Sequence, residues 1–234
     1  MSTLTLVRHA QAQLFQRESS VLSALGEAQA ALLARRWIES GVCFDEILTG
    51  ALARQTQTEQ VVAKRFHEAG RPWPAARRDS SWNEYDALGV LERMVPADPR
   101  LGVLAADFER ARGGPEEKRS FQRMFQAAMT HWMEGTLDRE GVELWPAFRD
   151  RVTAAIARIM AGPPGRRIAV FTSGGPIGLT VQVALKAPAR SFLETHWRIR
   201  NTSVTEFLFD RERLTLDSFN CISHLDDRGL HTYR

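Results

Sequence analysis

The sequence has few of the residues that mark secreted, metal-binding or membrane-spanning proteins. Its 234 residues include two cysteines, Cys43 and Cys221, which are too few for a disulfide framework or a zinc site. No apolar run approaches the ~20 residues that span a bilayer, and the first residues show neither the basic segment nor the cleavage site of an export signal. We therefore expect a cytoplasmic protein that binds no membrane.

Lysine is scarce as well. Three of the 31 basic residues are lysines, Lys64, Lys118 and Lys186, and the net charge is +3. The arginines are spread along the chain among 28 acidic residues, without the basic tail or the basic and aromatic alternation of nucleic-acid-binding segments. We expect no nucleic-acid partner, so an individual arginine matters only where its position gives it a task.

The sequence does contain a regular alternation of predicted strands and helices. An apolar run at 4–7 predicts a buried strand, and helical spacing over 22–40 predicts a helix. The same order follows, with a strand predicted over 44–50 and a helix over 51–69. The pattern returns later, with a helix over 146–160, a strand over 168–172, a helix over 174–186 and a hairpin over 204–209 and 214–219. This order predicts an α/β fold, a three-layer α/β/α sandwich around a mostly parallel sheet.

The middle of the chain shows no strand pattern. Proline and glycine pairs interrupt it, and residues 116–134 repeat apolar side chains at helical spacing. We interpret residues 86–145 as a helical lid inserted in a single domain that covers residues 1–234. No motif lies in this insertion, where we expect the selection of substrate. The sequence makes no prediction of oligomeric state.

Four polar patches are expected at the carboxyl ends of the sheet's strands: Arg8 with His9, residues 49–54, Asn83 with Glu84, and residues 172–175. Ligands of open α/β sheets bind at the carboxyl ends of the strands, so the fold would bring these patches together. Each patch alone has an ordinary structural explanation. Together they bring an imidazole, a carboxylate and two guanidinium groups to the carboxyl ends of the strands. They also bring a glycine-rich helix start to the same place, and such a helix start suits an anion.

The ordered set of patches resembles the histidine phosphatase superfamily, in its phosphoglycerate mutase-like branch. Residues 6–11 read LVRHAQ and are similar to the family's Arg-His-Gly signature, and 22–30 resemble the segment that follows it. Residues 49–58, TGALARQTQT, are similar to the stretch Ser-x-Leu-x-Arg-x-x-x-Thr. Asn83-Glu84 and 172–177, TSGGPI, resemble the family's acid and its late His-Gly-Gly patch. The resemblance covers about 3–85 and 145–225.

The resemblance implies a phosphatase that hydrolyses a small-molecule phosphomonoester without a metal or other cofactor. His9 would attack phosphorus as a neutral imidazole and form a phosphohistidine. Its other ring nitrogen should then be held by a backbone carbonyl. Glu84 would protonate the leaving oxygen and later activate water.

The resemblance also implies which groups hold the phosphoryl oxygens. Arg8 and Arg54 would clamp the dianion with their planar guanidinium groups. Ser173 and Gly174, where the predicted helix begins, would support the same oxygens.

Two residues depart from the family pattern. Ala10 stands where the signature has glycine, which is acceptable if its backbone is not left-handed. Ser173 stands where the family usually has a second histidine, so a neutral hydrogen bond replaces a charged one. The loss of about 1–2 kcal/mol would slow the step roughly 5- to 30-fold. The replacement by serine favours a phosphatase over a mutase.

Two alternatives stay open. A catalytically weak or inactive member of this fold would bind a phosphorylated ligand and act in regulation. A serine hydrolase would use Ser173, since Ser173, Asp217 and His224 follow the order of the α/β-hydrolase triad. The second alternative is weaker because Phe171 stands where the nucleophile elbow needs glycine. We expect His224 to have a structural role.

Overall fold

The computed structural model describes residues 1–12, 21–135 and 141–233. The contacts within the chain divide it into two units. One unit contains Met1–Glu84 and Val152–Arg234, and the other contains Tyr85–Arg151.

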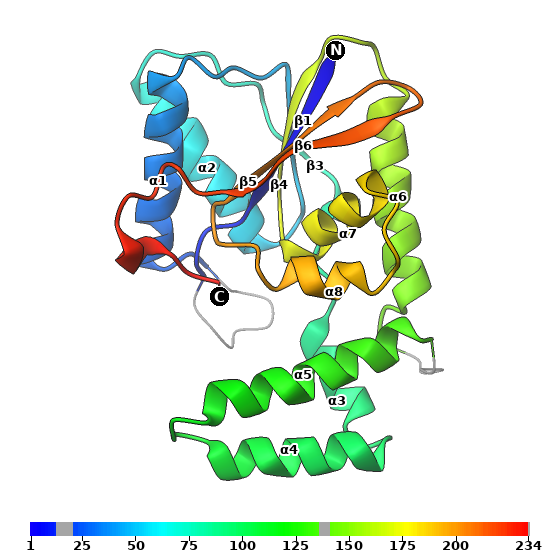
Figure 1. Cartoon of the computed structure of the whole chain (residues 1–234). Coiled ribbons are helices and arrows are strands. Elements are labelled where there is room, and N and C mark those ends of the chain that lie inside the picture. Colours follow the sequence, from blue (N-terminus) through cyan, green and yellow to red (C-terminus); the bar gives the residue numbers. More distant parts are fainter. Residues whose placement is uncertain (13–20, 136–140, 234) are drawn as a thin grey trace. The chain divides into compact units, whose positions relative to one another are not determined.

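A six-stranded, mostly parallel sheet lies at the centre of the first unit (Figure 1). The strands are β1 (Ser2–Arg8), β2 (Glu46–Thr49), β3 (Arg77–Arg78), β4 (Arg167–Thr172), β5 (Val204–Phe209) and β6 (Leu214–Cys221). Their order in the sheet is β3-β2-β4-β1-β5-β6. The four strands β1, β2, β3 and β4 pair in parallel, whereas β5 pairs antiparallel with β1 and with β6. The predicted fold class is therefore confirmed. β3 was not predicted, because two residues are too short for a periodic pattern.

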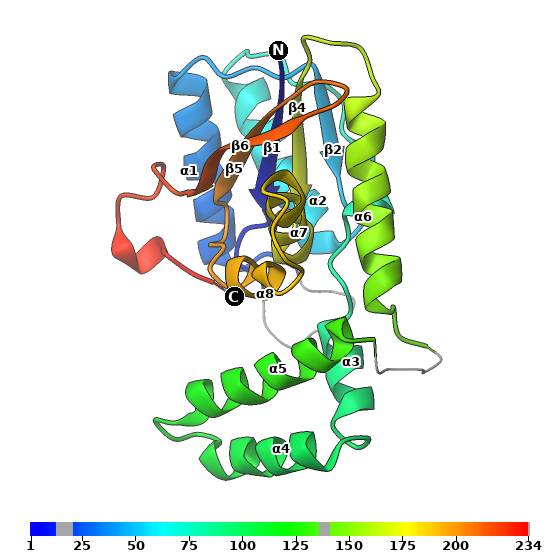
Figure 2. The same ribbon diagram turned by 45° about the vertical axis from the view of Figure 1, so that its right-hand side comes forward.

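Helices cover both faces of this sheet (Figure 2). α1 (Ala24–Glu39) and α2 (Ala53–Glu68) lie on one face, and α7 (Gly174–Ala184) and the later part of α6 (Trp145–Met160) lie on the other. A short helix, α8 (Ser191–His196), which the sequence did not predict, packs against α7. The core between α1, α2 and the sheet is buried and apolar: Val7, Ala30, Leu33, Trp37, Ile47, Val62, Phe66, Ala169 and Phe171.

Local chemistry explains where α1 begins and ends. The hydroxyl of Ser23 accepts a hydrogen bond from the Gly26 amide at 3.0 Å, which caps the first turn. At the other end, Gly41 takes a φ of +66°, a left-handed conformation that glycine adopts without a steric penalty. The predicted helix over 22–40 is thus two residues too long at its start and one too long at its end, and the capping residues account for the difference.

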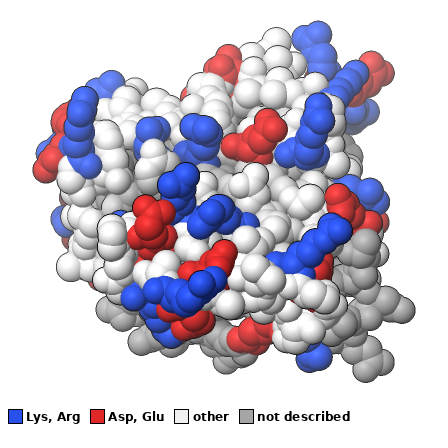
Figure 3. All heavy atoms as spheres, turned by 60° about the horizontal axis from the view of Figure 1, so that its bottom comes forward, with Lys and Arg blue, Asp and Glu red and all other residues white. Residues whose placement is uncertain are grey.

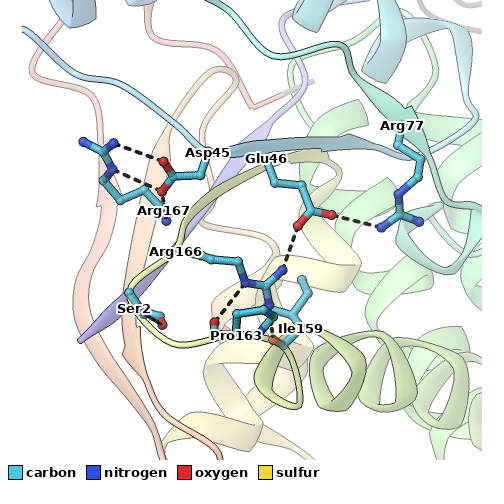
Figure 4. Close-up of polar contacts among 9 residues, drawn as sticks. Ser2, Asp45, Glu46, Arg77, Ile159, Pro163, Arg166 and Arg167 are labelled. Carbon is cyan, nitrogen blue, oxygen red and sulfur yellow. Dashed lines mark hydrogen bonds and ion pairs between the residues drawn. The ribbon is translucent and has the colours of Figure 1, made fainter.

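Ion pairs join the amino-terminal ends of β2 and β4. The polar patches lie at the opposite, carboxyl ends of these strands. The Glu46 carboxylate accepts from Arg166 at 2.9 Å and from Arg77 at 3.0 Å (Figure 4). Asp45 pairs with Arg167 at 3.2 Å and also accepts from its backbone amide at 2.7 Å. The backbone hydrogen bond fixes the β2–β4 register here, whereas half-exposed ion pairs add little free energy of unfolding.

The second unit is helical. It contains α3 (Ala87–Met94), α4 (Pro99–Ala111), α5 (Glu117–Met133) and the first residues of α6. Tyr85 and Trp132 stack with their ring centroids 4.5 Å apart, and Trp145 and Phe148 pack around them. The sequence identified the helical character of this segment and the helix near 116–134, but not α3 and α4 as separate helices. Residues 136–140 of the predicted lid lie outside the described residues, and its action as a lid stays a prediction.

The surface and the helices agree with the composition of the chain. None of the helices in the described ranges is both long and apolar enough to cross a membrane. Among the described residues on the face in Figure 3, arginine and lysine side chains alternate with acidic ones and form no continuous basic surface.

The chain just after β1 is held in place by a polar segment that precedes β5. The Asn201 side-chain amide donates to the His9 carbonyl at 2.9 Å, and the Thr202 backbone amide donates to the Arg8 carbonyl at 3.1 Å. Thr202 has a φ of +54°, an unusual value for a β-branched residue. Its hydroxyl lies 2.9 Å from Nε2 of the buried His224. His224 therefore supports the turn that carries the predicted nucleophile.

We predict that His224 makes the free energy of unfolding depend on pH. Burial lowers the pKa of His224 from 6.5 to about 4. Below pH 6.5 the unfolded chain binds a proton at this site that the folded chain refuses, so stability falls as the pH falls toward 4. The expected loss by pH 4.5 is about 2–3 kcal/mol.

Chemical denaturation of the wild type and of His224→Gln between pH 7 and 4.5 measures this effect. The variant should show a smaller loss of stability on acidification, by about 2–3 kcal/mol. His67→Gln, at an exposed histidine on α2, serves as the control and should follow the wild type. Equal slopes for all three proteins would contradict the assignment.

Candidate active site

The four polar patches meet at the carboxyl ends of the parallel strands. Nε of Arg54, from the start of α2, lies 3.1 Å from Nε2 of His9, just after β1. The His9 amide donates to the Thr172 carbonyl at the end of β4 at 2.8 Å. Glu84 follows β3 through a short 3-10 helix, Ser80–Trp82, and accepts from the Gly175 amide. The sequence thus predicted the meeting of these segments correctly.

The environment of His9 keeps its ring neutral. The ring is buried, with 8% of the residue exposed. Burial lowers the pKa of His9 well below 6.5, and the nearby positive charges of Arg54 and Arg8 lower it further, whereas a hydrogen bond to the Ala10 carbonyl raises it. Desolvation and two like charges outweigh the hydrogen bond, so the imidazole carries no charge at neutral pH.

The contacts of His9 also decide which ring nitrogen carries the hydrogen. Nδ1 lies 2.8 Å from the Ala10 carbonyl oxygen, which can only accept, so Nδ1 bears the hydrogen. Nε2 faces the N–H of Arg54, which can only donate, so Nε2 presents a lone pair. The prediction that a backbone carbonyl fixes one ring nitrogen is confirmed.

Ala10 fits its place after the strand. Its backbone is not left-handed, as the replacement of glycine required. The Ala10 amide donates to the Thr58 hydroxyl at 2.9 Å, and that hydroxyl donates to the Arg54 carbonyl at 2.6 Å. Thr58, to which the sequence analysis gave no role, therefore couples the nucleophile's turn to the helix that carries Arg54.

The two predicted clamp arginines are held from different elements. Arg54 is the second residue of α2, where a cation opposes the helix dipole. Burial lowers its pKa, and the negative charge of Glu84 acts against that shift. Arg8 ends β1, and one of its guanidinium nitrogens donates to the Ile199 carbonyl, which precedes β5. Each side chain thus has a fixed anchor beside His9.

Glu84 lies at the amino-terminal end of α7. Both of its carboxylate oxygens are within reach of the Gly175 amide, at 3.1 and 3.0 Å. The helix start that was expected to face an anion therefore already holds one, the carboxylate of Glu84. The role of Gly174 toward a phosphoryl group stays a prediction.

Ser173 is fully buried and precedes α7. Its hydroxyl accepts a hydrogen bond from the side-chain amide of Gln55 at 2.9 Å. Gln55 is also fully buried and comes directly after Arg54, but the sequence gave no signal for it because glutamine is an ordinary residue in a helix.

The geometry does not favour the serine-hydrolase alternative. The hydroxyl of Ser173 accepts from Gln55, Nε2 of His224 contacts Thr202, and Asp217 is exposed on β6. The structure thus shows Ser173 and His224 bonded to other partners and not to each other as a triad requires.

The site shows no arrangement typical of a metal centre. In residues 1–12, 21–135 and 141–233, no three His, Cys, Asp or Glu side chains are grouped to hold a metal ion. The positive charge near His9 comes from arginine.

Known proteins were compared with the chain. A model of the histidine phosphatase superfamily (branch 1) matches residues 4–98 and 106–222. Phosphoglycerate mutase-like protein 4 of Arabidopsis thaliana is 37% identical over 90 residues, which are 38% of this chain and 37% of that relative. The matched part is therefore well under half the length of this relative.

Solved structures show the same fold. A candidate alpha-ribazole-5'-P phosphatase of Escherichia coli gives a TM-score of 0.67 at 19% identity, over 95% of this chain and 98% of that one. A phosphoglycerate mutase of Bacillus anthracis gives 0.64 at 20% identity, over 95% and 94%. At this identity the likeness establishes the fold alone. The family match spans most of the chain, and the protein therefore belongs to the histidine phosphatase superfamily, branch 1.

Proposed function

We propose that this protein is a phosphomonoesterase that works through a phosphohistidine on His9 and needs no metal. The observation that carries the proposal is the geometry of His9. Its Nδ1 is held by the Ala10 carbonyl at 2.8 Å, and its Nε2 lone pair lies 3.1 Å from Arg54. A neutral imidazole fixed in one tautomer beside guanidinium groups is suited to attack a phosphoryl dianion.

In the first step, the N–H of Arg54 turns from Nε2 to the phosphoryl group, and the freed lone pair of Nε2 forms a bond to phosphorus while the bond from phosphorus to the ester oxygen breaks. Arg54 and Arg8 neutralise the phosphoryl oxygens. The ester oxygen leaves with a proton from the Glu84 carboxyl group, and the negative phosphoryl group favours that protonated form. The products are an alcohol, an ionised Glu84 and a phosphohistidine.

In the second step, water attacks phosphorus and gives its proton to Glu84, and the bond between Nε2 and phosphorus breaks. This step needs the ionised carboxylate, which the Gly175 amide stabilises at 3.0–3.1 Å. His9 returns to its neutral tautomer and inorganic phosphate is released. One carboxyl group thus serves both steps, first as acid and then as base.

The superfamily also contains mutases, and the solved structures similar to this chain carry both phosphatase and mutase names. We favour the phosphatase because Ser173 offers a neutral hydrogen bond, which holds a phosphorylated intermediate less tightly than a charged one. A regulatory protein that binds phosphorylated ligands without turnover is the second candidate. It is favoured by Ser173, whose buried hydroxyl brings no positive charge to the phosphoryl site.

We predict that His9→Ala lowers the rate of hydrolysis of 4-nitrophenyl phosphate by roughly three orders of magnitude or more. The reason is that the proposed covalent intermediate forms on the ring of His9. After rapid quenching with labelled substrate, the wild type should carry acid-labile phosphate and the variant none. His67→Ala is the control, and EDTA should leave the wild-type rate unchanged. Binding of phosphate without turnover in the wild type would favour the regulatory protein.

We predict that the His9 ring stays neutral to well below pH 6.5. Nitrogen NMR of the ring should show a hydrogen on Nδ1 and a lone pair on Nε2 at pH 6. Arg54→Ala removes one nearby positive charge, so the pKa of His9 should rise toward its ordinary value. Arg65→Ala, at an exposed arginine of the same helix, should change nothing. An ordinary titration near pH 6.5 in the wild type would contradict the prediction.

We predict that the effect of Glu84→Gln depends on the leaving group. A nitrophenolate leaves readily without a proton, so its release should slow less than about 10-fold. An alkyl alcohol needs the proton, so its release should slow by about 100- to 10,000-fold. The values of kcat/KM on the two esters measure the difference because they report the first step alone, up to release of the alcohol, with Glu27→Gln, at an exposed carboxylate of α1, as the control. Equal losses on both esters would remove the acid role.

A further inference from the structure

We propose that Gln55 is a positioning residue that turns the Ser173 hydroxyl into a hydrogen-bond donor for the phosphoryl group. The proposal rests on the proposed function, in that it assumes an oxyanion beside His9. It assigns a task to a buried amide that lies outside the expected site residues. It also states how this chain compensates for the serine that stands where the superfamily usually has histidine.

The register of the sheet places Ser173 next to His9. β1 and β4 pair in parallel, with Val7 opposite Phe171 and Arg8 opposite Thr172. His9 and Ser173 come directly after this last pair, and the His9 amide still donates to the Thr172 carbonyl at 2.8 Å, so we infer that they also lie opposite each other. Opposed residues of neighbouring strands point to the same face. Val7 and Phe171 face α1 and α2 in the core. His9 and Ser173 therefore also face α2, whose first turn carries Arg54 and Gln55.

The contacts of Gln55 fix the orientation of its amide. Its oxygen accepts from the Leu52 backbone amide at 3.2 Å, and that partner can only donate. Its nitrogen donates to the Trp82 carbonyl at 3.1 Å, and that partner can only accept. The same nitrogen points to the Ser173 hydroxyl at 2.9 Å. Flipping the amide would break two backbone hydrogen bonds, so Ser173 always meets a donor.

A hydroxyl group has one hydrogen to donate. Because Gln55 donates to Ser173, the hydrogen of that hydroxyl must point away from Gln55. Ser173 precedes α7 but its side chain does not cap that helix. We infer that this hydrogen points toward the side of His9, where the phosphoryl oxygens would lie. Gln55 thus selects the donor orientation that an oxyanion requires.

The room around Gln55 is adapted to this arrangement. A side chain at Gly50 would place its Cβ 2.0 Å from the Gln55 amide oxygen and 3.0 Å from the Asn83 amide oxygen. An imidazole at position 173 would extend from the place of the serine hydroxyl into the Gln55 nitrogen, which lies 2.9 Å away. Gly50 therefore leaves the room that the Gln55 amide needs, and we expect an imidazole at position 173 to compete with Gln55 for space.

The test is the affinity of the full-length protein for inorganic phosphate, measured by calorimetry at pH 7 where every variant is folded. Gln55→Ala and Ser173→Ala should each weaken binding roughly 3- to 10-fold. The double variant should bind no more weakly than the weaker single variant, because both changes remove the same contact. Gly50→Ala should act like Gln55→Ala, since it displaces the amide. Gln60→Ala, at an exposed glutamine of α2, should bind like the wild type.

A second comparison uses the histidine that the superfamily usually has. Ser173→His alone should gain neither phosphate affinity nor turnover, because Gln55 occupies the space of the ring. Ser173→His combined with Gln55→Ala should bind phosphate more tightly than Gln55→Ala alone. A gain from Ser173→His with Gln55 in place would overturn the proposal.

The outcomes separate this proposal from the proposed function. Additive losses in the double variant, or unchanged binding in Ser173→Ala, would overturn the role of Gln55 and leave the phosphohistidine chemistry intact. Coupled losses without any phosphohistidine in the wild type would support Gln55 and overturn the phosphatase. A wild type that binds no phosphate would overturn both.

Discussion

The hydrogen bond from His9 Nδ1 to the Ala10 carbonyl is the contact on which the site depends. It decides that Nε2 carries the lone pair, which accepts from the N–H of Arg54. Without it, burial and the arginine charges would still keep the ring neutral, but the N–H of Arg54 alone would fix the tautomer. The rest of the site maintains this one geometry, through the amide of Ala10 on Thr58 and the carbonyl of His9 on Asn201.

Backbone register is the second constraint. Parallel pairing of β1 with β4 brings His9 and Ser173 level with each other, and the short β2 and β3 deliver Arg54 and Glu84 from the neighbouring strands. The chemistry is thus assembled from turns that follow strands, where the backbone is set by the sheet. This is the usual place for ligands in open α/β sheets.

These features explain which parts were predictable from the sequence. Apolar runs and helix periodicity revealed β1, β2, β4 and the long helices. The polar residues after β1 and β2 revealed His9 and Arg54, whereas Glu84 came from the resemblance to the superfamily. The two residues of β3 and the six residues of α8 are too short to show a period. Gln55 and Asn201 could not be predicted because their roles come from contacts with residues far away in the chain.

The ion pairs of Asp45 and Glu46 lie at the other end of the same strands. β4 has six residues, so Arg167 and Ser173 are separated by about 20 Å at ~3.3 Å per residue. At that distance, changes to the charged residues at the amino-terminal ends of the strands do not disturb the site residues at the carboxyl ends. The protein can therefore be made more heat-resistant at its amino-terminal edge without the loss of activity that usually accompanies stabilisation close to a reactive centre.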